Sequence, residues 1–396
     1  MNTKPVLNQI LYGPPGTGKT YNTVVEAIKI IDKNIINYDD NGNVINYDVV
    51  KAEFDKYKEQ GRIEFVTFHQ SYSYEEFVEG IKSYINGNVL QFIKDGIFKE
   101  FCNRKTTIED KYNYFKYLYD IKKLPNEFKS ENGKNYFISK FDDSTFEITR
   151  IGGTTNSCTT EKFKNAVLLE CGDLKSTNLR KKAGVGNGLE MNIIELRNYI
   201  RQLEVPKVLI IDEINRGNIS KIFGELITLI EPDKRLGKEH ALKVKLPYSQ
   251  DEFGVPRNLY IIGTMNTSDK SLSLSDAALR RRFEFKPMYP KRSGFENSEI
   301  LNALNDEILK RKKSADYLIG HSYFMSDDTL VNIFNHKVIP LLMEYFDGKI
   351  KDVKELLENV FDIENAWKKE YEYINDENEK DYYYLQLEEE TNVIIK

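Results

Sequence analysis

Ile10-Leu-Tyr-Gly-Pro-Pro-Gly-Thr-Gly-Lys-Thr20 is the stretch that decides the fold. It is a short apolar run followed by glycines and then Lys-Thr, and it matches the phosphate-binding loop pattern G-x-x-x-x-G-K-[ST]. In such a loop the backbone N–H groups surround a polyphosphate, the lysine neutralises phosphate oxygens and the Thr hydroxyl is a ligand of Mg²⁺. The segment from Thr20 to Ile31 is expected to form the helix whose positive end faces the phosphates.

Gly16 and Gly18 allow the backbone of this loop to turn inward around the phosphates. A glycine-rich turn that arose by chance is the alternative, and the remainder of the chain decides between the two. The residues expected to bind nucleotide in this region are Gly13, Pro14, Pro15, Gly16, Thr17, Gly18, Lys19, Thr20 and Tyr21.

Lys207-Val-Leu-Ile-Ile-Asp-Glu213 is the clearest strand, since four apolar residues precede two carboxylates. Continuous apolar runs are typical of central strands that are covered on both faces. We expect Asp212 to hold Mg²⁺ together with Thr20, and Glu213 to polarise the attacking water, although two acidic residues at a strand end also aid solubility. Asn266 follows the strand expected at 258–264 and can hydrogen-bond the same water, because the carboxyl ends of neighbouring parallel strands converge.

Three consecutive arginines follow Leu279 on one expected helical turn, so they point in different directions and cannot all serve one site. They are Arg280, Arg281 and Arg282. One of them can act as an arginine finger on a neighbouring subunit's γ-phosphate, and the alternative is a basic triplet stabilised by the helix dipole. Arg216, just beyond the two acids, can contact the phosphates or an adjacent subunit. The sequence leaves these choices open.

Strands that alternate with helices, beginning with the phosphate loop, predict an α/β fold. We expect a parallel doubly wound sheet with helices on both faces over residues 1–290, followed by a smaller helical lid subdomain and C-terminal tail over 291–396. Residues 123–188 are expected to be an insertion with a β-hairpin at 135–150. Further expectations are a helical stretch from Phe92 to Asp120, a helix from Ile219 to Glu231, a loop at 152–160 and a hairpin turn at 254–256.

The composition indicates an ordinary globular protein of 396 residues, with 40% apolar and 30% charged residues. The 57 Lys and Arg residues against 62 Asp and Glu argue against a surface dedicated to coating nucleic acid, so the basic runs at 180–182 and 310–313 are read first as solvated faces. Three cysteines without C-x-x-C spacing predict free thiols in a reducing cytoplasm. Neither a signal peptide nor an apolar run long enough for a membrane span occurs, so we expect a cytoplasmic protein with no membrane partner.

Several spaced segments together resemble the AAA+ superfamily. They are 13–20, 211–221, 263–269 and 278–283. With Phe68-His-Gln-Ser-Tyr-Ser-Tyr-Glu-Glu-Phe-Val-Glu-Gly80 and Ile319-Gly-His-Ser-Tyr-Phe324, the chain resembles more narrowly the McrB motor family of modification-dependent restriction systems. The resemblance covers most of residues 1–350 apart from the insertion.

The resemblance implies a GTPase that uses Mg²⁺, forms a hexameric ring, and drives DNA translocation for an McrC-like endonuclease subunit. It also matches the family's Asn-Thr-x-Asp motif to Asn266, Thr267, Ser268 and Asp269, which makes Asp269 a candidate catalytic residue. His321 falls where the lid is expected to approach the nucleotide, and the alternative is a histidine that only packs within the lid. The family's N-terminal domain for methylated DNA has no counterpart ahead of the phosphate loop, which predicts a truncated chain or a partner that supplies recognition.

Guanine preference depends on the resemblance alone, because the chain has no Asn-Lys-x-Asp base-reading motif. Two other functions therefore stay open: an ATP-dependent AAA+ chaperone that remodels proteins, and a nucleotide-gated assembly scaffold. The intact Asp212-Glu213 pair disfavours the scaffold, which has no need of the glutamate. No nuclease motif is present, so DNA cleavage is expected from another chain.

Overall fold

The computed structural model describes residues 5–40, 42–86, 88–129, 133–169, 176–186, 188–268, 277–375 and 380–396. The chain divides into two compact units. Unit 1 comprises Met1–Cys102 and Val208–Lys396, and unit 2 comprises Asn103–Lys207. Among the described residues, no helix is both long and apolar enough to cross a membrane.

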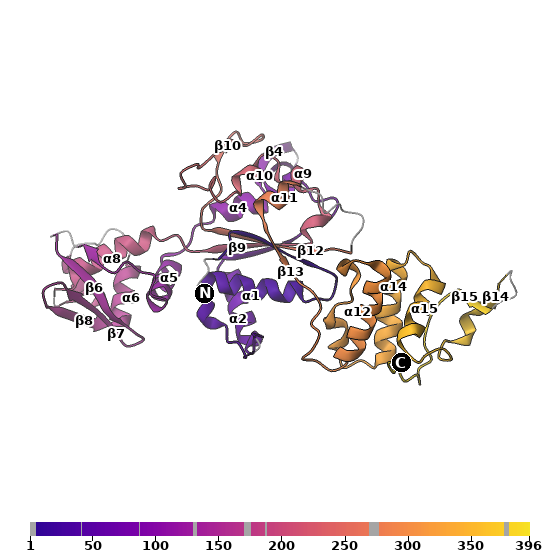
Figure 1. Ribbon diagram of the computed structural model, residues 1–396. Helices are drawn as coiled ribbons and strands as arrows, with labels where there is room; N and C mark the ends of the chain where they lie inside the picture. Colours follow the sequence, from indigo (N-terminus) through magenta and orange to yellow (C-terminus); the bar gives the residue numbers. More distant parts are fainter. Residues whose placement is uncertain are drawn as a thin grey trace. The chain divides into compact units, whose positions relative to one another are not determined.

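A five-stranded sheet in the order β13-β1-β12-β9-β2 forms the centre of unit 1 (Figure 1). Its strands are β1 (Asn8–Gly13), β2 (Ile63–Thr67), β9 (Lys207–Asp212), β12 (Leu259–Asn266) and β13 (Glu284–Pro287). β1 pairs in parallel with both β12 and β13, and β2 pairs in parallel with β9. The first strand therefore lies inside the sheet with later strands on both sides, which confirms the predicted doubly wound α/β fold.

Helices cover both faces of this sheet, as Figure 1 shows. On one face, α1 (Lys19–Asp32) and α2 (Tyr47–Glu59) pack against Leu11, Val208, Ile210 and Ile262. The alternate residues of the same strands point to the other core. That second face carries α3 (Tyr74–Phe77), α4 (Ile97–Asn103), α9 (Ile219–Phe223), α10 (Leu226–Leu229) and α11 (Ala277–Arg282). Burial on both faces explains why these strands are continuously apolar.

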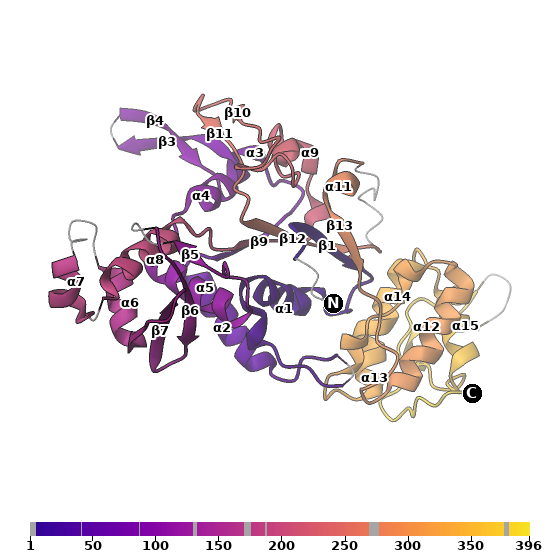
Figure 2. The same cartoon turned by 60° about the vertical axis from the view of Figure 1, so that its left-hand side comes forward.

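Two antiparallel hairpins project from unit 1 on the side of this second core (Figure 2). They are β3 (Glu79–Asn86) with β4 (Asn88–Asp95), and β10 (Val244–Lys245) with β11 (Glu252–Phe253). The helical prediction from Phe92 was therefore wrong at its start, because Phe92 pairs with Lys82 in a strand and helix begins only at Ile97. The turn of the second hairpin lies between Lys245 and Glu252 and not at 254–256.

The helix predicted from Ile219 to Glu231 is interrupted at Gly224, where φ is +51°. Asn218 caps α9 as its sequence position suggests, since its side chain accepts a hydrogen bond from the backbone N–H of Lys221. A Cβ added at Gly224 would lie 3.0 Å from the ring of Tyr74, so the break allows α3 to pack closely.

The lid region is helical and has its own apolar core. Its helices are α12 (Ser298–Lys312), α13 (Leu330–Ile333), the π-helical turn η6 (Phe334–Val338), α14 (Ile339–Tyr345) and α15 (Ile350–Val360). The tail that the sequence left unassigned packs on this core, because Leu385, Leu387 and Val393 are buried and Trp367 bridges to Leu387. A short hairpin, β14 (Glu372–Ile374) with β15 (Lys380–Tyr382), precedes that segment. Further helical turns among the described residues of unit 1 are η1 (Lys33–Ile35), η3 (Ile214–Arg216), η4 (Ala315–Tyr317), η5 (His321–Phe324) and η7 (Lys369–Tyr371).

Unit 2 is built on a four-stranded antiparallel sheet in the order β5-β6-β7-β8 and has a separate aromatic core. Its elements are α5 (Ile108–Asp120), β5 (Phe128–Lys129), β6 (Asn135–Phe141), β7 (Thr145–Arg150), β8 (Thr155–Thr159), α6 (Thr160–Leu168), α7 (Ser176–Ala183) and α8 (Glu190–Gln202). The hairpin predicted at 135–150 is confirmed, whereas the loop predicted at 152–160 contains β8. Unit 2 is wider than the insertion predicted at 123–188, because α5 and α8 supply core residues such as Phe115 and Leu196.

Candidate nucleotide-binding site

The phosphate loop connects β1 to α1. Gly16 and Gly18 have φ values of +74° and +76°, which favour glycine, and Gly18 directly precedes the first turn of α1. Lys19 is buried, and its Nζ donates to the carbonyl oxygens of Gly13 at 3.0 Å and of Pro14 at 2.7 Å. The Thr17 hydroxyl also donates to Pro14 O at 3.0 Å. The side chains of Thr17 and Lys19 thus hold the conformation of the loop by hydrogen bonds to its own backbone carbonyl groups.

Four side chains meet where β9 and β12 end, and we refer to them as the nucleotide edge: Asp212, Glu213, Thr264 and Asn266. The Thr264 hydroxyl donates to Asp212 Oδ1 at 2.5 Å and accepts from the backbone N–H of Glu213 at 3.0 Å. Thr264 was missed by the sequence reasoning. The available signal was a polar residue inside the otherwise apolar strand 259–265, which the structure buries.

Glu213 has a left-handed backbone, with φ 53° and ψ 44°. This conformation costs about 1–3 kcal/mol for a residue with a side chain, and such strain is concentrated at functional sites. The Asn266 amide donates to Glu213 Oε1 at 2.5 Å, so the structure brings these two predicted residues together. Arg216 also contacts Glu213, with its Nε 3.3 Å from Oε2.

The nucleotide edge lies beside the phosphate loop. Gly13 is opposite Asn266 in the pairing of β1 with β12, and the backbone N–H of Thr267 donates to Gly13 O at 3.1 Å. β9 is the next strand in the sheet. The carboxyl ends of three adjacent strands therefore present the loop, Asn266 and the two carboxylates at one edge, which is where open α/β sheets bind ligands.

The lid reaches the same loop through η5. The backbone N–H of Ser322 donates to Gly16 O at 3.0 Å, and a Cβ added at Gly16 would lie 2.5 Å from the ring of Tyr323. His321 Nδ1 accepts from the backbone N–H of Lys291 at 3.2 Å, and its Nε2 lies 4.0 Å from the position a Cβ at Gly18 would take. Burial, together with the charge of Lys291, lowers the pKa of His321. Its role as a nucleotide ligand stays a prediction.

The three arginines are separated as predicted. Arg282 pairs with Glu231 at 2.8 Å and is mostly buried, and the guanidinium of Arg280 lies 6.0 Å from the ring centroid of Phe285. Arg281 is exposed, and no partner for it lies among the residues that the structure describes. Arg281 is therefore the one of the three best placed to act on another molecule. Asp269 lies outside the described residues.

Tyr21 is exposed and stacks on Tyr47, with ring centroids 3.9 Å apart and planes inclined by 16°. Tyr47 comes from α2 and was not anticipated at the site. The pair extends an aromatic surface from the start of α1, next to Thr20.

Comparison with known proteins agrees with this geometry. The family model described as "AAA domain (dynein-related subfamily)" matches residues 173–283, and the one described as "McrB, alpha-helical lid domain" matches residues 296–354. The chain is 41% identical over 179 residues to the "Type IV methyl-directed restriction enzyme EcoKMcrB subunit" of Escherichia coli, covering 37% of this chain and 38% of that protein. The two matches and this identity support an McrB-type AAA+ subunit.

A second relative is the "Type II restriction enzyme BsuMI component YdiS" of Bacillus subtilis, which is 26% identical over 165 residues, or 35% of this chain and 48% of that protein. This chain thus spans less than half the length of each of these two relatives. The lid match contains the segment with His321, and the AAA match contains the nucleotide edge and the arginine triplet.

The oxygens of Thr20 and Asp212 fit the magnesium site expected of an AAA+ protein, because Mg²⁺ takes hard oxygen ligands and uses few carboxylates from the protein. The hydrogen bond from Thr264 fixes one oxygen of Asp212, and its other oxygen has no partner among the described residues. Within that described part, no group of three or more His, Cys, Asp and Glu side chains is arranged to hold a metal ion.

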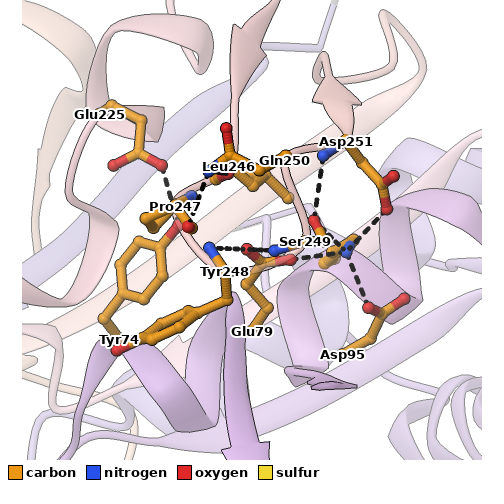
Figure 3. A network of polar contacts seen from close by, with 11 residues as sticks. Tyr74, Glu79, Asp95, Glu225, Leu246, Pro247, Tyr248, Ser249, Gln250 and Asp251 are labelled. Carbon is orange, nitrogen blue, oxygen red and sulfur yellow. Dashed lines mark hydrogen bonds and ion pairs between the residues drawn. The ribbon is translucent and has the colours of Figure 1, made fainter. Parts of the chain in front are cut away.

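A second polar network joins the base of the β3–β4 hairpin to the turn of the β10–β11 hairpin, and we call it the hairpin network: Glu79, Asp95, Lys99, Tyr248 and Ser249 (Figure 3). Lys99 Nζ lies 2.8 Å from both Glu79 Oε2 and Asp95 Oδ1, and Glu79 Oε1 accepts from the backbone N–H groups of Tyr248 and Ser249 at 2.9 and 3.0 Å. Burial by itself would raise the pKa of Glu79, but these hydrogen bonds hold it below its ordinary value.

Two tyrosine hydroxyl groups connect the hairpin network to α3 and to Glu225. The Tyr74 hydroxyl donates to Glu225, the residue before α10, at 2.8 Å, and the Tyr248 hydroxyl donates to Glu75 at 2.7 Å. α3 itself begins with the capping box predicted from sequence, in which Ser73 and Glu76 satisfy each other's backbone N–H groups. The turn of the β10–β11 hairpin is thus joined to α3, and α3 is joined to the residue before α10.

Proposed function

We propose that this McrB-type AAA+ chain is a nucleoside triphosphatase that hydrolyses GTP and acts as the motor of a restriction system in the cytoplasm. The observation that carries the proposal is the nucleotide edge beside the phosphate loop, with the strained Glu213 held by Asn266. The matches to the AAA domain and the McrB lid support the same conclusion. The AAA+ assignment supports hydrolysis of either GTP or ATP. The preference for GTP is proposed from the resemblance to the McrB family.

In the proposed reaction the loop backbone and Lys19 hold the phosphates, and Glu213 orients a water for attack on the γ-phosphate. Asn266 keeps the Glu213 carboxylate in place, and Thr264 does the same for Asp212. Mg²⁺, held by Thr20 and Asp212, would supply positive charge against the phosphate oxygens. Proton transfer to a positioned carboxylate typically contributes 10²–10⁴-fold to a rate, so Glu213 is expected to dominate turnover.

The proposal includes a homo-oligomeric ring, taken as hexameric, in which each site is completed by the neighbouring subunit. Arg281 is assigned as the finger that reaches the neighbour's γ-phosphate, because Arg282 is engaged by Glu231 within its own chain. Hydrolysis in the ring would drive DNA translocation for an McrC-like endonuclease. That cooperation is in keeping with the names of the two relatives, which are both components of restriction enzymes.

The test is steady-state hydrolysis of GTP and ATP, measured side by side across protein concentration. The proposal expects preference for GTP and a specific activity that rises steeply as subunits associate. Lys19→Ala is the control that should abolish turnover of either nucleotide. Equal or better use of ATP would reject the GTP assignment, and a specific activity independent of concentration would reject the shared site.

A further inference from the structure

Unit 2 contains a cavity of about 250 Å³ where the end of α5, the loop at 121–127, β5 and β6 meet. Three aromatic rings line it, from Tyr119, Phe128 and Phe137. A cavity of about 150 Å³ is sufficient to hold benzene, so this one has room for a single planar ring system. The cavity lies within unit 2 and shares no residue with the nucleotide edge.

Two of these rings have rigid support. Phe128 packs edge-on against Tyr199, with centroids 5.2 Å apart, and Tyr119 packs against Phe141 at 5.6 Å. Phe137 differs, because 37% of it is exposed although it lies in the middle of a sheet strand. Its neighbour Tyr136 points into the core and is fully buried. An exposed ring beside two fixed ones provides a surface on which another aromatic ring can stack.

Polar side chains lie at the same cavity. Lys122 and Asn126 both line it and are exposed, and neither side chain has a hydrogen-bond partner within the part of the chain that the structure describes. Lys122 has φ 55°, and its backbone N–H donates to Tyr119 O at 2.9 Å, so a defined turn fixes its backbone. The cavity thus combines stacking surfaces with one amide, which both donates and accepts, and one cation.

Unit 2 is basic in an acidic chain. Residues 103–207 contain 19 Lys and Arg against 14 Asp and Glu, whereas the remaining residues contain 38 against 48. A domain with a net positive charge attracts polyanions. This asymmetry favours nucleic acid over a protein side chain or a neutral metabolite as the source of the ring in the cavity.

We propose that the cavity of unit 2 binds one unstacked base of DNA. Phe137 stacks on the base, Asn126 hydrogen-bonds to its edge and Lys122 pairs with an adjacent phosphate. Proteins read bases that have left the stack by this combination of aromatic stacking and edge contacts. The assignment rests on the proposed function, because it gives a DNA-driven motor its own DNA-reading surface.

The experiment measures DNA binding by the full chain with fluorescence anisotropy, using a labelled duplex and its single strand. A 2-aminopurine in each probe reports loss of stacking. Phe137→Ala is expected to weaken binding by about 5- to 150-fold, which is the range for loss of one stacked base, and to abolish the 2-aminopurine response. Ile151→Ala is the matched control, since Ile151 is an exposed apolar residue of unit 2 outside the cavity.

Asn126→Asp tests the same site without removing any packing, because Asn126 is exposed and the change adds only a negative charge. It should weaken binding with no change in the unfolding of unit 2. Lys122→Ala should make the dependence of log K on log salt shallower by about 0.7–0.9, the value for one lost phosphate contact. Binding by Phe137→Ala and Asn126→Asp equal to that of Ile151→Ala would overturn the proposal.

Nucleotide hydrolysis without DNA separates failure of this inference from failure of the proposed function. All these variants should hydrolyse nucleotide at the parent rate, since none belongs to the nucleotide edge. A parent chain that hydrolyses nucleotide but binds neither probe would overturn the cavity assignment alone. A parent chain that does not hydrolyse nucleotide would overturn the proposed function, whatever the cavity binds.

Discussion

Both polar networks of unit 1 are built around carboxylates, but they place them in opposite environments. In the hairpin network, the Glu79 side chain has no exposed surface and that of Lys99 is 6% exposed, and each charge has several partners. At the nucleotide edge, Asp212 and Glu213 are only partly buried, and Glu213 has a strained backbone. Buried charges whose hydrogen bonds are all made, as in the hairpin network, stabilise the fold. Partly exposed carboxylates on a strained backbone, as at the nucleotide edge, are suited to contact a ligand and take part in chemistry.

Glu213→Gln is expected to have the largest effect. Turnover should fall by about 10²–10⁴-fold, because glutamine cannot accept the proton of the attacking water. The free energy of unfolding should change by less than about 1 kcal/mol, since the amide oxygen still accepts from Asn266. Single-turnover hydrolysis and denaturant unfolding of the same preparation check the two expectations. A variant that hydrolyses as fast as the parent would remove Glu213 from the mechanism.

Lys99→Met should show the reverse pattern. Removing one partner leaves Glu79 as a buried, uncompensated charge, and the expected loss is about 3–5 kcal/mol in the free energy of unfolding. Turnover per folded molecule should stay within a few-fold of the parent. The double variant Glu79→Gln with Lys99→Met is the control and should recover part of the stability, because the unpaired charge is gone. A turnover loss as large as that of Glu213→Gln would erase the distinction between the two networks.

The sequence predicted where three parts of the candidate site lie in the fold, but it missed Thr264. The phosphate loop, the Asp212-Glu213 pair and Asn266 each follow a run whose residue types fix a buried strand. The hairpin network has no such signal. Glu79 and Tyr248 are 169 positions apart, and their contact depends on how two hairpins pack. Phe92 was misread for a related reason, since a short apolar run is compatible with helix and strand until its pairing partner is known.

In unit 2, the sequence predicted a local element but not the bounds of the whole domain. Its hairpin at 135–150 was predicted from alternation around a turn, but its extent was not, because nothing in the sequence of α5 or α8 shows which unit each helix packs in. The contact of the lid with Gly16 could not be predicted from the sequence either. Sequence places Ser322 and Tyr323 in a motif of the family, and only the fold brings them onto the phosphate loop.

Thr264→Val tests whether the hydrogen bonds of the Thr264 hydroxyl to Asp212 and Glu213 contribute to stability and turnover. Valine has nearly the same shape but leaves Asp212 Oδ1 and the Glu213 N–H without their hydrogen bonds. We expect a loss of about 1–3 kcal/mol in the free energy of unfolding, which is less than that of Lys99→Met, and about a tenfold drop in turnover, which is less than that of Glu213→Gln. Thr264→Ser, which keeps the hydroxyl, is the control and should retain most of the activity. Equal behaviour of the valine and serine variants would show that the hydroxyl is dispensable.

The pH dependence of His321 should give the smallest effect. Its pKa is lowered from 6.5 by burial and by the charge of Lys291, so the folded chain binds fewer protons at this site than the unfolded chain does. The contribution of His321 to the free energy of unfolding is therefore fully present above pH 6.5. It is lost as the pH falls below 6.5 toward the lowered pKa of the folded state. His321→Gln removes this titration, and its unfolding midpoint should change less than that of the parent between pH 7.5 and 5.5. Every other titrating group is common to both chains, so the difference in slope reports His321 alone. Identical slopes would mean that the contact of η5 with the phosphate loop does not depend on a neutral imidazole at His321.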